Sequence, residues 1–124
     1  AAESETTMYH GYVSEEKKIE LMQRSWLQLM PSRSEAFPLV VLEANAAGTP
    51  VISSDITGFT DSIEDGVNGF RCYSEEMVQT SIEILGDREY QQQLSRSSQK
   101  YAEQYSWERT AKAIDEVVQS YVSP

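Results

Sequence analysis

Two short runs of apolar residues restrict the folds that this chain can adopt. The run WLQLM, residues 26–30, is closed by Pro31, and the run VISS, residues 51–54, follows a second proline. Short apolar runs bounded by turn signals are typical of strands that a protein buries. We therefore expect two strands here, separated by about twenty residues.

The segment between these runs has the composition of a helix. It reads FPLVVLEANAA, residues 37–47. Pro38 suits the first turn of a helix, where its missing N–H is not needed, and Gly48 suits the position just past the end. Strand, helix and strand with short connections predict parallel strands joined by a right-handed crossover.

The rest of the chain continues the alternation and then becomes helical only. Ser14, Asp87 and Ser106 are expected to cap helices, because their side chains can accept hydrogen bonds from open N–H groups. Ser74 is expected to do the same. The expected elements are a strand over 6–13, a helix to about Ser25, a strand over 69–73, and helices to about Leu85, Tyr105 and Tyr121.

This order of elements predicts the α/β class, with a Rossmann-like parallel sheet, helices on both faces and a helical C-terminus. Residues 1–124 are expected to form a single domain, with 1–5 frayed. In the last helix one face is expected to be buried, because apolar residues recur at helical spacing. They are Ala111, Ile114, Val117, Val118 and Tyr121.

Composition excludes several classes of function. The net charge is −10 and the bases form no cluster, so nucleic acid is not an expected partner. No apolar run approaches 18 residues, so no transmembrane segment is expected. The single cysteine, Cys72, can form no internal disulfide and is compatible with a reducing compartment. With no signal peptide visible, the expected location is cytoplasmic.

Two acids flank the start of the central helix. Glu35 precedes it and Glu43 lies inside it, with seven residues between them. The N–H groups of Leu39 and Val40 belong to the open first turn, which favours an anion such as phosphate. Glu43 follows on the same face, and a carboxylate can accept hydrogen bonds from two neighbouring hydroxyls. A diol–diphosphate–diol ligand, such as a nucleotide-sugar, would match this order. Alternatively, Glu43 is a solvated helix acid and Glu35 a loop acid.

Five segments in order carry a resemblance to a known family. They are HGYVSEEKKIELMQRS, LMPSRSEAFP, EAFPLVVLEANAAGTPVISSD, GFTDSIEDGVNGF and YSWERTA, and the match runs from Tyr9 to Thr110. Together they resemble the E-x7-E region and its surroundings in the C-terminal, donor-binding domain of retaining glycosyltransferases of the GT-B fold. This is the "glycosyl transferases group 1" family.

The resemblance implies a role for each matching residue. Glu35, the first acid, would be the catalytic residue, contacting hydroxyls of the transferred sugar, and Phe37 and Pro38 would shape the turn beside it. Backbone N–H groups of Leu39 and Val40 would meet the diphosphate. Glu43 would hold the ribose hydroxyls. A UDP- or GDP-sugar would be the donor substrate, with no cofactor and no metal.

The sequence departs from the family pattern in details and in extent. Ala36 stands where glycine is usual, and Thr60 and Asp61 stand where Pro-Glu is usual. The N-terminal acceptor domain and the first strands of the donor domain have no counterpart. In the family, those strands provide an Arg/Lys pair that contacts the donor phosphates. Without this pair, the helix dipole stabilises the diphosphate by only about 0.3–1 kcal/mol per charge, which is too little for tight binding. We therefore expect a fragment of a hexosyltransferase that is inactive alone.

Two classes of function remain open. The first is the donor-binding part of an enzyme that transfers a sugar with retention. The second is a non-catalytic module that binds nucleotide or associates with itself. If the strand over 6–13 lacks a neighbour, its open edge could pair with a second copy in a homodimer.

Overall fold

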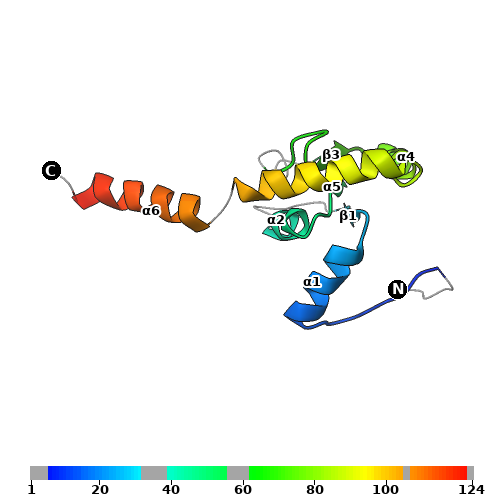
Figure 1. The fold of residues 1–124 in the computed structure, drawn as a ribbon, viewed down its shortest axis with the longest axis horizontal. Coiled ribbons are helices and arrows are strands. Elements are labelled where there is room, and N and C mark those ends of the chain that lie inside the picture. The colour runs from blue at the N-terminus through cyan, green and yellow to red at the C-terminus, as the bar shows by residue number, and fades with distance from the viewer. Residues whose placement is uncertain (1–5, 32–38, 56–61, 105–106, 123–124) are drawn as a thin grey trace.

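A computed structural model describes residues 6–31, 39–55, 62–104 and 107–122 (Figure 1). These residues form five helices and three strands. In chain order the elements are α1 (Glu15–Arg24), β1 (Gln28–Met30), α2 (Leu39–Ala46), β2 (Val51–Ser54), β3 (Gly69–Cys72), α4 (Ser74–Leu85), α5 (Arg88–Glu103) and α6 (Trp107–Val122).

The three strands form one parallel sheet in the order β1-β2-β3. Leu29 pairs with Ile52, and Ile52 pairs with Phe70. The strand–helix–strand unit expected from the sequence is therefore β1–α2–β2, with β2 in the middle of the sheet. The Rossmann-like α/β class is confirmed.

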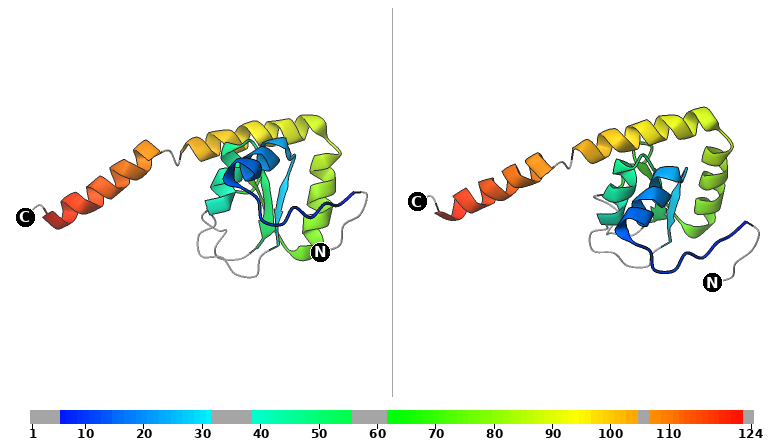
Figure 2. Two further views of the ribbon diagram at one scale, coloured as in Figure 1. Left: turned by 90° about the horizontal axis from the view of Figure 1, so that it is seen from below. Right: turned by 60° about the horizontal axis from the view of Figure 1, so that its bottom comes forward.

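Both faces of the sheet are covered, as Figure 2 shows with α1 and α4 on opposite sides of the strands. Val51 and Ile52 are neighbours in β2 and are both fully buried, but they belong to different apolar clusters. This follows from the strand period of two residues. The first cluster is Met22, Val41, Ala44, Val51 and Ile63, and the second is Ile52, Cys72, Met77, Ile84 and Leu94.

Helix ends mostly follow the sequence signals. The Ser14 side chain accepts a hydrogen bond from the N–H of Lys17 at 3.1 Å, and Asp87 accepts one from Tyr90 at 3.1 Å. The expected cap at Ser74 is wrong, because α4 begins at Ser74 itself. The N-cap is Tyr73, which makes no capping hydrogen bond with its side chain. The expected cap at Ser106 lies outside the described residues.

The strand expected over 6–13 does not form. Its β-branched and aromatic residues have the intrinsic preference for a strand, but a strand also needs a partner with which to exchange hydrogen bonds. The three strands of the sheet do not pair with this segment. Met8, Tyr9 and Tyr12 are consequently exposed.

The apolar face of α6 is also not buried where its side chains are described. The helix extends away from the sheet and its covering helices (Figures 1 and 2). Ile114, Val117 and Val118 are at least half exposed, and Tyr121 is 88% exposed. Helical spacing indicates which residues share a face. It does not indicate whether the same chain provides a surface to cover that face, which is why the expectation was wrong.

A buried polar network connects the end of α2 to the turn before β3. Asn45 and Asn68 are both fully buried, and the amide nitrogen of Asn68 donates to the side-chain oxygen of Asn45 at 2.9 Å. Asn45 also donates to the backbone oxygen of Thr49 at 3.0 Å. Asn68 donates to Ser62 O at 2.7 Å and accepts from Glu64 N at 2.8 Å.

Gly69, at the start of β3, lies against the backbone of β2. Its φ is +150°, a conformation that residues with a side chain rarely adopt. A Cβ at this position would overlap the carbonyl oxygen of Val51. The residue therefore allows two parallel strands to approach at a point where no side chain fits.

Cys72 ends β3 inside the second apolar cluster. Burial raises the pKa of its thiol, while the Thr80 hydroxyl, 3.7 Å from the sulfur, acts in the opposite direction. A buried thiol with a raised pKa is a structural residue rather than a nucleophile.

Candidate functional site

The start of α2 and strand β1 line a common pocket, to which they contribute Val40 and Gln28. The first described residues of α2 differ in burial: Leu39 is 63% exposed, Val40 is partly buried, and Val41 is fully buried in the first cluster. The first N–H groups of a helix have no acceptor within the helix. In this chain they lie in a helix whose first turn contains no acidic residue.

Glu43 lies one turn further along α2, four residues after Leu39. Its side chain is 38% exposed, and its Oε2 is 2.9 Å from Nζ of Lys18 in α1. Lys18 also contacts Oε1 of Glu15 at 3.2 Å. The two ion pairs raise the pKa of Lys18, with the hydrogen bond to Glu43 as the largest cause.

Sequence reasoning missed Lys18. The candidate site residues were all taken from the segment around α2, whereas Lys18 comes to α2 from a different helix. Helix spacing could have placed Lys18 on the same face of α1 as Glu15 and Met22. The contact of this face with α2 depends on how the two helices pack.

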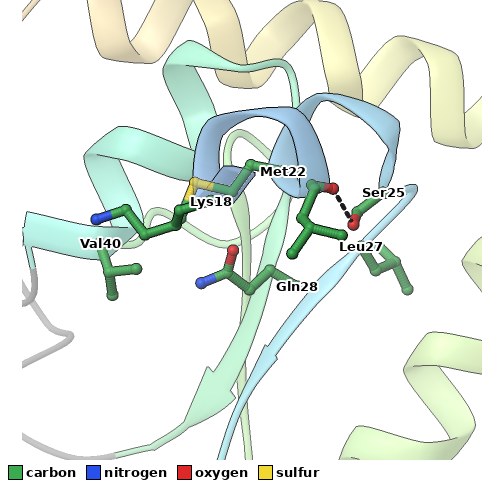
Figure 3. Close-up of a pocket in the computed structure, with 7 residues that line it drawn as sticks. Lys18, Met22, Ser25, Leu27, Gln28 and Val40 are labelled. Carbon is green, nitrogen blue, oxygen red and sulfur yellow. Dashed lines mark hydrogen bonds between the residues drawn. The ribbon is translucent and has the colours of Figure 1, made fainter. Parts of the chain in front are cut away.

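A cavity of about 300 Å³ lies between α1, β1 and the start of α2 (Figure 3). Apolar side chains form most of its lining, and Lys18 and Val40 lie next to each other at one end. The Ser25 hydroxyl is not available there, since it donates to the Leu21 oxygen at 2.6 Å. The lining residues are Lys18, Leu21, Met22, Ser25, Leu27, Gln28 and Val40.

A second group of charges lies at the carboxyl ends of β2 and β3. Arg71 is 3.9 Å from Asp55 and 3.9 Å from Asp65, and all three are partly exposed. The guanidinium and the two carboxylates together carry a net charge of about −1, so Arg71 adds no free positive charge here.

The site residues expected from the sequence are only partly described. Leu39, Val40 and Glu43 lie together on α2. Glu35, Phe37 and Pro38 fall outside the described residues, as do Ala36, Thr60 and Asp61. The ligand-binding roles of all these residues remain predictions.

The described part of the chain lacks two further features. It contains no group of three or more His, Cys, Asp or Glu side chains that could hold a metal ion. None of its helices combines the length and the apolar character needed to cross a membrane.

Comparisons with a family profile and with individual known proteins both identify glycosyltransferases as similar to this chain. The profile of the family described as "Glycosyl transferases group 1" matches residues 3–101. The chain is 36% identical over 104 residues to a Mycolicibacterium smegmatis protein named D-inositol 3-phosphate glycosyltransferase, covering 82% of this chain and 24% of that protein.

Proteins of the same name in two other organisms are also similar. The Nocardia farcinica protein is 31% identical over 102 residues, covering 80% of this chain and 23% of the relative. The Streptomyces griseus protein is 27% identical over 123 residues, covering 97% of this chain and 26% of the relative. The chain thus spans about a quarter of the length of these relatives.

Proposed function

Because this chain belongs to the glycosyl transferases group 1 family, we propose that it contributes the donor side of a glycosyltransferase site. The ligand is the nucleotide diphosphate of a UDP- or GDP-sugar, bound at the start of α2 with the ribose at Glu43. The observation that carries the proposal is the partly exposed carboxylate of Glu43, one turn beyond the N-terminal N–H groups of the helix.

The chemistry of this arrangement supports the proposal in two ways. Helix N-terminal N–H groups and the helix dipole favour an anion such as the diphosphate. An ionised carboxylate accepts hydrogen bonds only, so it suits a pair of ribose hydroxyls. In the described part of the chain, Oε1 of Glu43 has no hydrogen-bond or ion-pair partner, which leaves it able to accept from a ligand.

The remaining roles follow from the family pattern. Glu35 orients the transferred sugar, and Phe37 and Pro38 shape the turn near it. The transfer retains the anomeric configuration and uses no metal. Its acceptor is held outside the quarter of the relatives' length that this chain covers.

Titration with UDP and GDP, followed by backbone amide shifts in NMR spectra, tests the donor site. We expect millimolar binding with shifts centred on Leu39, Val40 and Glu43. Glu43→Gln removes the charge from a hydrogen-bonded acceptor, which is worth about 1.5–3 kcal/mol, so affinity should fall about ten-fold or more. The matched control is Glu103→Gln, an exposed glutamate on α5.

Two results would refute this proposal. One is the absence of shifts with either nucleotide at millimolar concentration. The other is binding that Glu43→Gln and Glu103→Gln leave equally unchanged, because the ribose would then lie elsewhere.

Self-association is a second candidate function, and the open edge of the sheet favours it. β1 pairs with β2 on one side, and its other side meets no strand among the described residues. Leu29 in β1 is 54% exposed. An edge strand with an exposed apolar residue can pair with another chain. This edge, rather than residues 6–13, is where a homodimer would form.

Light scattering after size exclusion checks this second candidate. We expect a concentration-dependent dimer that Leu29→Lys weakens, because a charge on an edge strand opposes pairing. Ile82→Lys, at an equally exposed apolar residue of α4, serves as the control and should leave the dimer intact. A monomer at all concentrations would rule out edge pairing.

A further inference from the structure

We infer that Lys18 is a positioning residue of the donor site, which acts on the ribose through Glu43 rather than by touching the nucleotide. This inference rests on the function proposed above, in which Glu43 holds the ribose diol. The ammonium group of Lys18 occupies Oε2 of Glu43 and leaves Oε1 to the ligand.

The contact between Lys18 and Glu43 differs from the other lysine pair on α1. Lys17 pairs with Glu20 of the same helix at 3.6 Å, and both side chains are well exposed. Lys18 reaches a different helix at 2.9 Å, and about a third of each side chain is exposed. An N⁺–H···O⁻ distance in this range is that of a charge-assisted hydrogen bond, which is stronger and more directional than a loose ion pair.

Glu15 explains why Lys18 would not bind the phosphates itself. Lys18 lies between Glu15 and Glu43, so its single positive charge is shared by two carboxylates. The three groups together carry a net charge of about −1 at neutral pH. Such a cluster does not attract a diphosphate, but the contact with Lys18 restricts the rotamers of the Glu43 side chain.

Figure 3 shows how this arrangement is supported. The Lys18 side chain lies along the cavity beside Val40, and its ammonium reaches Glu43 of α2. Lysine commonly lays its stem along apolar surface and keeps its charged end at a polar partner. Two ion pairs, to Glu43 and to Glu15, therefore hold the Lys18 ammonium in place.

The consequence is a selective effect on ligands that carry a ribose diol. A glutamate on a half-exposed helix face otherwise samples several rotamers, and ordering one such side chain on binding is unfavourable. With Lys18 in place, the Glu43 side chain is already ordered before the ligand binds. Lys18→Met keeps the apolar stem but removes the ammonium, so Glu43 must then be ordered by the ligand.

The experiment compares four ligands and two variants by NMR titration of the full chain. The ligands are UDP, GDP and their 2′,3′-dideoxy forms, which lack the diol. We expect Lys18→Met to weaken UDP or GDP binding about five-fold, the size expected for ordering one side chain. Affinity for the dideoxy forms should not change. Lys17→Met, the adjacent control, should change neither.

A second measurement confirms that the pair exists in solution. The Lys18 pKa, followed through its side-chain resonances, should fall when Glu43→Gln removes the largest cause of its elevation. A merely structural role for Lys18 would not produce a loss restricted to ligands with a diol.

The other outcomes are each informative. An equal loss for ribose and dideoxy ligands would mean that Lys18 meets the phosphates, and this would overturn the inference. Tighter binding by Lys18→Met would also overturn it, because Lys18 would then be a competitor for Glu43. Binding that depends on Glu43 but not on Lys18 would defeat this inference alone. Binding independent of Glu43, or no binding at all, would defeat the proposed function as well.

Discussion

Gly69→Ala is expected to destabilise the fold by about 3 kcal/mol or more, since it combines backbone strain with overlap in a packed interior. The glycine has a φ of +150°, and an added Cβ would overlap the Val51 carbonyl oxygen. That oxygen belongs to the central strand, which cannot move without disturbing both apolar clusters. Urea unfolding followed by circular dichroism measures the loss.

Gly66→Ala provides the matched control. Gly66 also has a positive φ, +83°, but a Cβ there would meet nothing within 4 Å. Its cost is then backbone strain alone, about 1 kcal/mol. The difference between the two variants in free energy of unfolding then measures the cost of the overlap between β2 and β3. Equal losses would show that strand proximity is not what requires glycine at position 69.

Asn68→Ala is expected to destabilise the fold by about 2–4 kcal/mol. The substitution removes three hydrogen bonds, to Asn45, Ser62 and Glu64, and leaves their partners without the side chain that satisfied them. A buried polar group without a hydrogen-bond partner destabilises the folded state, because it has lost its hydrogen bonds to water without forming one in the protein. Thermal and urea unfolding of the variant measure the effect.

A double-mutant cycle with Asn45→Ala tests whether the two side chains act as one network. They share the 2.9 Å hydrogen bond, so the double variant should lose less than the sum of the single losses. Additive losses would mean that the network is not coupled.

The central part of the fold could be predicted because its signals are local. Pro31 and Gly48 mark the ends of elements, and Ser14 and Asp87 cap helices through contacts three residues away. The two apolar runs then require a sheet that buries them. No knowledge of distant contacts is needed for this, so the strand–helix–strand unit follows from sequence alone.

The errors concern elements that depend on a partner. Residues 6–13 have strand composition but join none of the three described strands. Val117 and Tyr121 share a face of α6 that no described part of the chain covers. The contact between Lys18 and Glu43 was missed for the same reason. This contact depends on the packing of α1 against α2. The spacing of apolar residues within either helix does not predict which other helix it will contact.

Val51 and Ile52 are adjacent in the central strand but belong to different apolar clusters, one on each face of the sheet. One extra residue in β2 would turn the side chains that follow it in the strand to the opposite face of the sheet. Each of them would then point into the wrong apolar cluster. Loops at the surface accept added residues readily, because their length changes chain entropy only slightly. The middle strand therefore tolerates a change of length less well than a surface loop does, because its residues fill both apolar clusters.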